Sequence, residues 1–482
     1  MDLDLTQESG PLTQRIATAL GRRVANGALG AGERLPSVRR LADRLGVSPF
    51  TVVAAYDRLV ADGLVVARAK SGFFVAGRRQ NKPLSLDPLP SAGTGVNPIW
   101  MMRRSLMLDA GQLKPGCGWL PQDWLPDAAL RSALRALSRA PEASLLEYGV
   151  PLGFRPLRDH LARRLSEIDI SAAPENILLM DSASQAIDLV CRYLIQPDDA
   201  VLVDDPGYFN FHAAVRAQRG RLLSVPMTPQ GPDLAAMEAL AKAHQPKLYL
   251  TNAGLQNPTG AKMSLAVAHR LLSLAQRYNF RILEDDIFRD FEVHPSPRLG
   301  ALDGLQRVIH MASFSKTLSA ATRIGYLAAD TTTVADLADL KLAMSFGNNE
   351  LSAQLVYRML MDGTYRKHVA AIRDRLARAR FQVARKLAAF GFAPWHVESA
   401  ESGEGLFLWL GLPAAKDGHP ILATEMALSA QAASIVLAAG NVFSPDAAWP
   451  HHMRFNVAQS HDSRIFGFLK SYLSRHGGTR AL

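Results

Sequence analysis

Cysteine is scarce in this sequence: only Cys117 and Cys191 occur in 482 residues, and they stand far apart. So few cysteines exclude a disulfide scaffold and are typical of a reducing compartment. Histidine offers no metal site either, because the pair His451–His452 has no further ligands at metal-binding spacing. We therefore expect free thiols and no bound metal ion.

Long apolar runs are missing as well. No stretch of about 18 apolar residues occurs, so we expect no membrane span. Residues 1–8 are acidic and polar, which is unlike a signal peptide. The glycine patterns of Walker and Rossmann nucleotide sites are also absent. Together these absences predict a cytoplasmic protein without a nucleotide site of either kind.

What the sequence does have is length and apolar material. A chain of 482 residues is too long for one ordinary core, so we predict two or three domains. At 48% hydrophobic residues, it has ample apolar material to bury. Basic residues exceed acidic ones by 54 − 44 = 10. This charge is compatible with a polyanionic partner, although many enzymes are equally basic.

The first 78 residues carry the pattern of a small DNA-binding domain. Apolar residues recur at helical spacing over 11–27 and 35–45, and Ser48 with Pro49 begins a third helix that runs to about residue 62. Short apolar strands at 64–67 and 73–76 flank a basic turn. Three helices followed by a basic hairpin predict a winged helix-turn-helix in residues 1–78.

Residues 79–110 are rich in proline, glycine and serine and have no sustained period, so we predict an interdomain linker. From 111 to 482, apolar runs alternate with amphipathic helices, which predicts a mostly parallel, doubly wound α/β sheet. The stretch 362–386 has the spacing of a long helix leading into a smaller C-terminal α+β subdomain. The predicted strands are 177–180, 200–203, 248–251, 281–283, 308–311 and 324–327, and the predicted helices include 184–195, 208–219, 233–243, 264–278 and 333–345.

Residues 35–64, LPSVRRLADRLGVSPFTVVAAYDRLVADGL, closely resemble the winged helix-turn-helix of GntR-type regulators. Residues 1–80 hold twelve Lys and Arg against seven Asp and Glu, which suits DNA. A single arginine on a helix face could be merely solvated, so the whole pattern carries this prediction. We expect DNA contacts from the helix starts, the second helix and the wing: Ser37, Arg39, Arg40, Arg44, Ser48, Pro49, Phe50, Thr51, Lys70, Ser71 and Gly72.

Residues 313–326, SFSKTLSAATRIGY, place Lys316 among small hydroxyl residues. A lysine that bonds covalently to an aldehyde cofactor needs a crowded site that disfavours its charge. Hydroxyls and a fixed cation suit the cofactor's phosphate, and Ser313, Ser315 and Arg323 offer them. The segment resembles the lysine segment of fold type I aminotransferases. That resemblance implies pyridoxal 5'-phosphate as cofactor and Lys316 as the catalytic residue.

Other segments follow the same family in chain order. The residues Ser182, Ala183 and Ser184 open a helix after a strand and could hold the phosphate, although a glycine is usual at position 182. By the resemblance, Tyr208 would stack on the pyridine ring. Asn257, in the sequence NPTG, would bond the ring hydroxyl.

The resemblance also implies the remaining contacts. Asp285 would keep the ring nitrogen protonated, with Asp286 as the alternative. Arg454 would bind a substrate carboxylate. Tyr148 would reach the phosphate of a neighbouring subunit, which implies a homodimer. The family often has a tyrosine two or three residues after the carboxylate of Asp285, and here those positions are Ile287 and Phe288.

The two halves together resemble the MocR subfamily of bacterial transcriptional regulators. That resemblance implies a regulator that binds an operator in double-stranded DNA and senses an amino compound or pyridoxal phosphate. Phe288 and Ser182 depart from the enzyme pattern and favour this reading. The alternative is a working aminotransferase of an amino acid with an auxiliary DNA-binding domain. A DNA-binding protein with an inactive second half is a third reading, against which the intact lysine segment argues.

Overall fold

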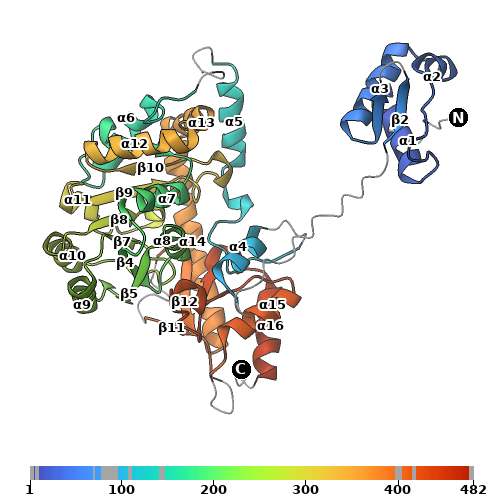
Figure 1. Cartoon of the computed structure of the whole chain (residues 1–482). Helices are drawn as coiled ribbons and strands as arrows, with labels where there is room; N and C mark the ends of the chain where they lie inside the picture. Colours follow the sequence, from blue (N-terminus) through green and yellow to red (C-terminus); the bar gives the residue numbers. More distant parts are fainter. Residues whose placement is uncertain are drawn as a thin grey trace. The chain divides into compact units, whose positions relative to one another are not determined.

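The computed structural model of the chain describes residues 5, 10–68, 71–76, 96–106, 111–140, 146, 148–396, 404–414 and 420–476. The chain divides into two compact units, Met1–Thr94 and Gly95–Leu482 (Figure 1). Among the described residues, no helix is both long enough and apolar enough to cross a membrane.

The first unit is a three-helix domain with a β-hairpin. Ser37 caps the second helix by accepting a hydrogen bond from the Arg40 N–H, and Gly46 ends this helix in the left-handed conformation, with φ 64°. The core gathers side chains from all three helices and both strands. The predicted winged helix-turn-helix is confirmed. Its elements are α1 (Leu12–Ala25), α2 (Val38–Leu45), α3 (Pro49–Ala61), β1 (Val65–Arg68) and β2 (Gly72–Val75).

The second unit is built on an eight-stranded sheet with the order β3-β10-β9-β8-β7-β4-β5-β6. The pairs that join β9, β8, β7, β4 and β5 are parallel, whereas β10 is antiparallel to both β9 and β3. The predicted mostly parallel sheet is therefore confirmed, with one reversed strand inside it. The strands are β3 (Ile177–Met180), β4 (Ala200–Asp205), β5 (Arg221–Thr228), β6 (Gly231–Pro232), β7 (Leu248–Thr251), β8 (Arg281–Asp285), β9 (Val308–Ser313) and β10 (Gly325–Ala328).

Helices cover both faces of this sheet, because alternate strand residues are apolar on both sides (Figure 1). One face packs against α7, α8 and α12, and the other against α6, α9, α10 and α13. The helices are α5 (Asp127–Leu137), α6 (Arg155–Ser166), α7 (Ala183–Leu194), α8 (Phe209–Ala217), α9 (Leu234–His244), α10 (Leu265–Arg277), α11 (Leu299–Asp303), α12 (Thr331–Ser345) and α13 (Glu350–Met361).

A long helix leads to a smaller C-terminal layer, as predicted. Four strands with the order β11-β12-β14-β13 form its sheet. Its elements are α14 (Thr364–Ala389), β11 (Ala393–Pro394), β12 (Phe407–Gly411), α15 (Ala423–Ala432), β13 (Ala438–Ala439), β14 (His452–Asn456) and α16 (Ser463–Arg475).

The predicted linker, 79–110, contains a helix that the sequence did not indicate. This helix is α4 (Pro98–Leu106), and its Met101 is buried in the core of the C-terminal layer. Asn441 also donates a hydrogen bond to the Val96 carbonyl at 2.8 Å. Residues 77–95 lie outside the described part of the chain. Val96–Leu106 therefore belongs structurally to the second unit.

Candidate functional site

Strand register brings three distant segments to one edge of the sheet. Gly325 at the start of β10 pairs with Met180 in β3 on one side and with Ser313 in β9 on the other. A Cβ built on Gly325 would lie 3.2 Å from the Ala183 nitrogen, so the strand passes close to the start of α7. Residues 182–183 and the lysine segment are thereby adjacent, as the sequence predicts for a phosphate site.

The start of α7 offers backbone donors at this edge. Ser182 caps the helix by accepting from the Gln185 N–H at 3.0 Å, and the first N–H groups of any helix lack partners within it. Ser313 Oγ donates to the Ile324 carbonyl at 3.0 Å and accepts from the Ser315 N–H at 3.2 Å. The serine hydroxyls therefore shape the loop, while the helix end remains suited to an anion.

Two of the predicted phosphate ligands are more open than the others. Ser184 is exposed on the first turn of α7. Arg323 is also exposed, adopts the left-handed conformation with φ 49°, and donates to the Ala320 carbonyl at 3.4 Å. Its charge nevertheless acts on Lys316, where it opposes protonation.

Lys316 is a half-buried amine between charges of both signs. Burial is the main reason that the pKa of Lys316 is lowered to about 8; the charges of Arg454 and Arg323 contribute to this lowering, while Cys117 and Asp285 oppose it. A neutral amine is the nucleophilic form, so a sizeable fraction of this lysine is reactive near neutral pH. This is the property that the sequence predicted for the catalytic lysine.

Asp285 ends β8 and is buried. Burial raises the pKa of Asp285 to about 7, although its carboxylate accepts a hydrogen bond from the Ile287 N–H at 3.1 Å. Asn252 donates to the Asp285 carbonyl at 3.1 Å and helps to fix the strand end. A nearby cation would stabilise the ionised form of this buried carboxylate, and a protonated pyridine nitrogen would be such a cation.

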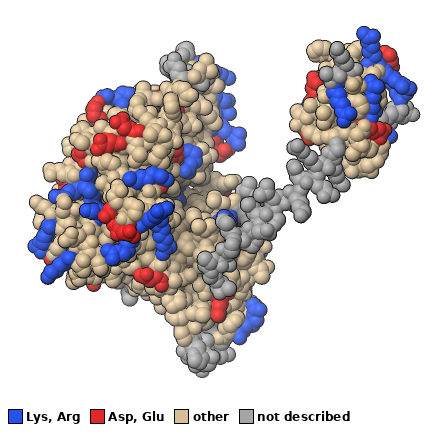
Figure 2. Space-filling view, in the orientation of Figure 1, with Lys and Arg blue, Asp and Glu red and all other residues tan. Residues whose placement is uncertain are grey.

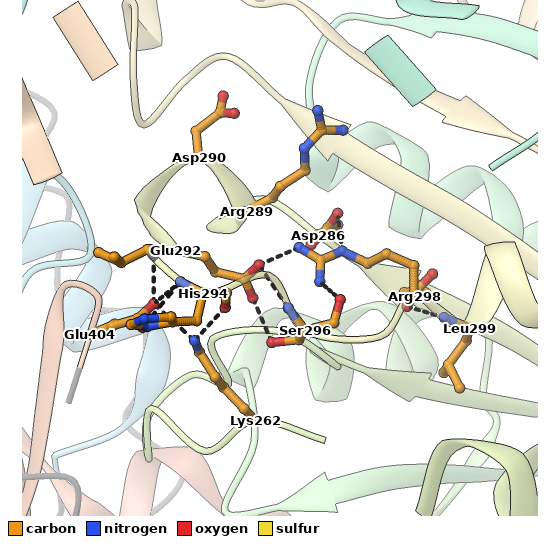
Figure 3. A network of polar contacts seen from close by, with 12 residues as sticks. Lys262, Asp286, Arg289, Asp290, Glu292, His294, Ser296, Arg298, Leu299 and Glu404 are labelled. Atoms are coloured by element: carbon orange, nitrogen blue, oxygen red, sulfur yellow. Dashed lines mark hydrogen bonds and ion pairs between the residues drawn. The ribbon is translucent and has the colours of Figure 1, made fainter. Parts of the chain in front are cut away.

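The alternative carboxylate, Asp286, is already paired. Its Oδ2 lies 2.8 Å from Arg298 Nε, and the same guanidinium reaches Glu292 at 2.7 Å. Ser296 Oγ in turn donates to Glu292 at 2.8 Å (Figure 3). Asp286 thus belongs to a buried ion-pair cluster next to the site, whereas Asp285 remains the predicted partner of the ring nitrogen.

Arg454 lies in β14 and is buried. Its Nη1 donates to Asn257 Oδ1 at 2.7 Å, and its Nη2 donates to the Gly116 carbonyl at 2.6 Å. The guanidinium also lies 4.3 Å from the Phe407 ring centroid and 4.7 Å from that of Phe443. Burial lowers the pKa of Arg454 to about 10, because a buried positive charge has lost its hydration. A bound carboxylate would offset that loss by pairing with the guanidinium.

Tyr208 precedes α8 and lies within the electrostatic reach of Asp285 and Arg454. Burial and Asp285 raise the pKa of the Tyr208 phenol, whose oxygen accepts a hydrogen bond from Asn210 Nδ2 at 2.7 Å. The ring packs 5.2 Å from Phe209 and 5.5 Å from Phe211, measured between centroids. Its stacking on the pyridine ring stays a prediction.

The loop Gly116–Gly118 also borders the site, although the sequence did not indicate it. A Cβ built on Gly118 would lie 3.9 Å from both Lys316 Nζ and Arg454 Nη2. Asn456 Nδ2 holds the loop by donating to the Cys117 carbonyl at 3.1 Å. Two glycines around one cysteine were the only signal, and their role depends on contacts more than 300 residues apart.

A second polar cluster fixes the loop that follows Asp285. Glu404 pairs with Lys262 at 2.8 Å and accepts from the Val293 N–H at 2.6 Å (Figure 3). Lys262 also donates to the His294 carbonyl at 2.7 Å. Residues from three distant segments thus hold the segment after β8 in place.

Tyr148 does not lie in a buried site of its own subunit. Its side chain is 83% exposed and packs against Phe346, with 5.3 Å between the ring centroids. Leu146 and Val150, which flank Tyr148 in the sequence, are exposed as well, and so is Met344 just before Phe346. The contribution of Tyr148 to a neighbouring subunit stays a prediction.

In the first unit, α2 and the start of α3 carry the predicted DNA contacts. Arg39, Arg40, Arg44, Pro49 and Phe50 are exposed, Ser37 and Ser48 cap the two helices, and Thr51 is half-buried. Figure 2 shows Lys and Arg side chains grouped on the visible face of this unit. Ser71 is exposed and Gly72 begins β2, whereas Lys70 lies outside the described residues.

Taken together, the fold and site define a fold type I protein whose residues fit pyridoxal phosphate. This cofactor needs an amine to bond its aldehyde, an anion for its ring nitrogen and donors for its phosphate. Lys316, Asp285 at the end of β8 and the start of α7 offer these groups, and Arg454 offers a cation for a ligand carboxylate. Arg454 Nε also has no hydrogen-bond partner among the described residues, as expected of a group that awaits a ligand.

Comparison with known proteins agrees. Residues 119–468 match the family "Aminotransferase class I and II", and residues 12–75 match "Bacterial regulatory proteins, gntR family". The chain belongs to the aminotransferase class I and II family and carries a GntR-type helix-turn-helix in front of that domain, which is the MocR-like architecture. The cofactor of this fold is pyridoxal phosphate.

Curated relatives share both halves. The chain is 28% identical over 456 residues to the uncharacterized HTH-type transcriptional regulator YdcR of Escherichia coli K12, covering 92% of this chain and 94% of that protein. It is 27% identical over 385 residues to the HTH-type transcriptional regulator NorG of Staphylococcus aureus, covering 78% of this chain and 86% of that protein.

Solved structures match the second unit. An α-aminoadipate aminotransferase, LysN of Thermus thermophilus, complexed with N-(5'-phosphopyridoxyl)-L-leucine, aligns with a TM-score of 0.67 and 25% identity, covering 78% of this chain and 95% of that one. The kynurenine aminotransferase of Pyrococcus horikoshii aligns with a TM-score of 0.68 and 24% identity, covering 75% of this chain and 90% of that one.

Proposed function

We propose that the protein is a cytoplasmic transcriptional regulator that binds an operator through its winged helix-turn-helix and senses an amino compound or pyridoxal phosphate through its second unit. The observation that carries this proposal is a reactive, half-buried lysine in an aminotransferase fold joined to a DNA-binding domain. The relatives named as HTH-type transcriptional regulators support it.

The roles of the site residues follow from their positions. Pyridoxal phosphate, when bound, supplies an aldehyde that bonds to amines and a ring that withdraws electrons. Lys316 Nζ would hold the cofactor and is deprotonated readily because burial lowers its pKa to about 8. Asp285 would face the ring nitrogen, and the start of α7 would bind the phosphate.

Arg454 would select ligands that carry a carboxylate. It is held by Asn257 and by the Gly116 carbonyl, so its direction is fixed before a ligand arrives. A bidentate contact to a carboxylate would replace water at its remaining donors. Amino acids are therefore the effector class that this site fits best.

A homodimer is part of this proposal. Exposed apolar side chains gather near Tyr148, and they include Val150, Phe346 and Leu351. Exposed apolar patches on a protein surface often mark interfaces. A second copy of the chain would bury them and would bring Tyr148 toward its partner's phosphate site.

Regulation would follow from linkage. A ligand that binds one conformation of the second unit more tightly shifts the population toward that conformation. If the two conformations present the DNA-binding domains differently, the affinity for DNA changes by the same coupling free energy. The test measures operator affinity on the DNA upstream of the protein's own gene, with and without pyridoxal phosphate and a panel of amino acids. An unchanged affinity with every amino acid that alters the cofactor absorbance would refute the sensor.

A second candidate is an active aminotransferase. Lys316, Asp285, Asn257 and Arg454 are all present, so amino-group transfer is chemically feasible at this site. Against it stands Phe288, which packs against Phe291 and Phe407 where the family often has a phenol. Steady-state transfer to a keto acid at roughly 1 per second or faster would favour the enzyme.

A further inference from the structure

The start of α3 presents an unusual surface for a helix that meets DNA. Ser48 Oγ accepts a hydrogen bond from the Thr51 N–H at 3.1 Å and lies 2.8 Å from Thr51 Oγ1. Pro49 has no N–H to donate. Both hydroxyls at this end are therefore engaged with the helix itself.

Phe50 stands out beside these occupied groups. Its side chain is 83% exposed, and it takes no part in the core that buries Val52, Ala55, Tyr56 and Leu59 on the other side of α3. An aromatic ring that is this exposed adds little to the domain's packing. The ring is therefore available to contact a partner outside the domain.

The rest of the same helix face lacks the side chains that read bases by paired hydrogen bonds. Positions three, four and seven residues after Phe50 share its face and are Val53, Ala54 and Asp57. The helix Pro49–Ala61 contains no Lys, Asn or Gln, and its one arginine, Arg58, lies in the last turn. Bidentate recognition of guanine or adenine is thus absent from the first two turns.

A helix in the major groove that offers an apolar tip can still read one base. The C5-methyl of thymine is the apolar group of the major groove, and phenylalanine is among the side chains that contact it. Exposed arginines on α2, namely Arg39 and Arg40, can bind phosphates and set the depth of α3. Positioning and base reading would then reside on different helices.

We propose that Phe50 recognises the C5-methyl group of a thymine, so that each operator half-site requires a thymine opposite the start of α3. This inference rests on the proposed function, because it assumes that the domain binds duplex DNA. It goes further by assigning the base and the chemical group that are read.

The test begins with full-length protein and a pool of duplexes with a randomised central region. Duplexes selected by wild-type protein are resynthesised with each thymine replaced, one at a time, by deoxyuridine, which lacks only the methyl group. We expect one position per half-site at which this replacement weakens binding about fourfold, the value for one buried methyl group. A cytosine at that position should weaken binding, and 5-methylcytosine should recover about the same factor.

Variants assign the effect to the residue. Phe50→Ala should bind thymine and deoxyuridine duplexes within about twofold of each other, while Phe50→Leu should retain part of the discrimination. Arg39→Ala serves as the matched control: it should weaken binding to both duplexes alike and reduce the salt dependence. Because Phe50 is exposed, circular dichroism and thermal unfolding of Phe50→Ala should match the wild type.

The outcomes separate the two proposals. If no duplex is enriched by the wild-type protein, DNA recognition by this domain is refuted and the inference falls with it. If duplexes are enriched but no thymine methyl matters, or if Phe50→Ala keeps the full methyl dependence, the inference is wrong while the proposed function stands.

Discussion

Replacing Arg298 with methionine should destabilise the second unit strongly. The guanidinium donates from Nε to Asp286 at 2.8 Å, from Nη2 to Glu292 at 2.7 Å and from Nη1 to the Ser296 carbonyl at 2.6 Å. All three charged side chains are almost fully buried (Figure 3). Arg298→Met would leave two carboxylates inside the protein without their cation.

Breaking a buried pair by removing one partner costs about 3–5 kcal/mol. We therefore expect the free energy of unfolding of the second unit to fall by about that amount. Denaturant unfolding followed by tryptophan fluorescence measures it. Arg155→Met is the control, since its pairs with Asp159 and Glu175 are exposed, and it should leave the unfolding midpoint unchanged.

The loss should also depend on pH. Burial raises the pKa of Asp286, and Arg298 works against this rise. Without the guanidinium the folded-state pKa of Asp286 rises further above its unfolded value, so the penalty is full at high pH and shrinks as the pH falls through that pKa. Equal stability of Arg298→Met and wild type at pH values of about 7 to 8 would refute the role assigned to this cluster.

Three further predictions concern the site and the interface. Because burial lowers the pKa of Lys316 to about 8, the rate at which cofactor-free protein takes up pyridoxal phosphate should rise from pH 7 to pH 8 and level off above about pH 9, as followed by absorbance. Arg454→Lys should weaken the response to amino acids about 10- to 100-fold, because a point charge replaces a bidentate donor, and should leave the response to amines without a carboxylate unchanged. Phe346→Asp should shift the protein from dimer to monomer in sedimentation velocity, because it places a charge in the exposed apolar surface beside Tyr148.

Much of the fold could be predicted because its signals are local. The strands Ile177–Met180 and Leu248–Thr251 are short hydrophobic runs in which only Thr251 is polar, and a helix follows each of them along the chain. Their pattern therefore needs no tertiary information. The caps at Ser37 and Ser48 likewise lie within three residues of the N–H groups they bind. Such features placed the lysine segment after a strand and α7 after another.

Other features depend on distant contacts and could not be found. The strand β5, Arg221–Thr228, contains a serine and a proline and is half-buried over much of its length, so its apolar pattern is weak. Helix α4 lies in a stretch with linker composition and is ordered by packing against the C-terminal layer. The sequence suggested Asn257 and Arg454 separately, but their hydrogen bond joins residues 197 positions apart.

The choice between Asp285 and Asp286 also depends on contacts that the sequence does not show. Two adjacent carboxylates after a strand look alike in sequence, and family pattern alone ordered them. In the structure Arg298 pairs with Asp286, whereas Asp285 has no cationic side chain within ion-pair distance among the described residues. Partners supplied by a loop twelve residues away therefore separate two residues of identical chemistry.

The most direct test of the whole proposal is chemical. Protein reconstituted with pyridoxal phosphate is reduced with borohydride, digested, and examined by peptide mass spectrometry. If Lys316 binds the cofactor covalently, one peptide containing this residue should carry the phosphopyridoxyl group, and Lys316→Ala should carry none. A reduced adduct on another lysine, or no adduct on the wild-type protein, would contradict both the sensor and the enzyme.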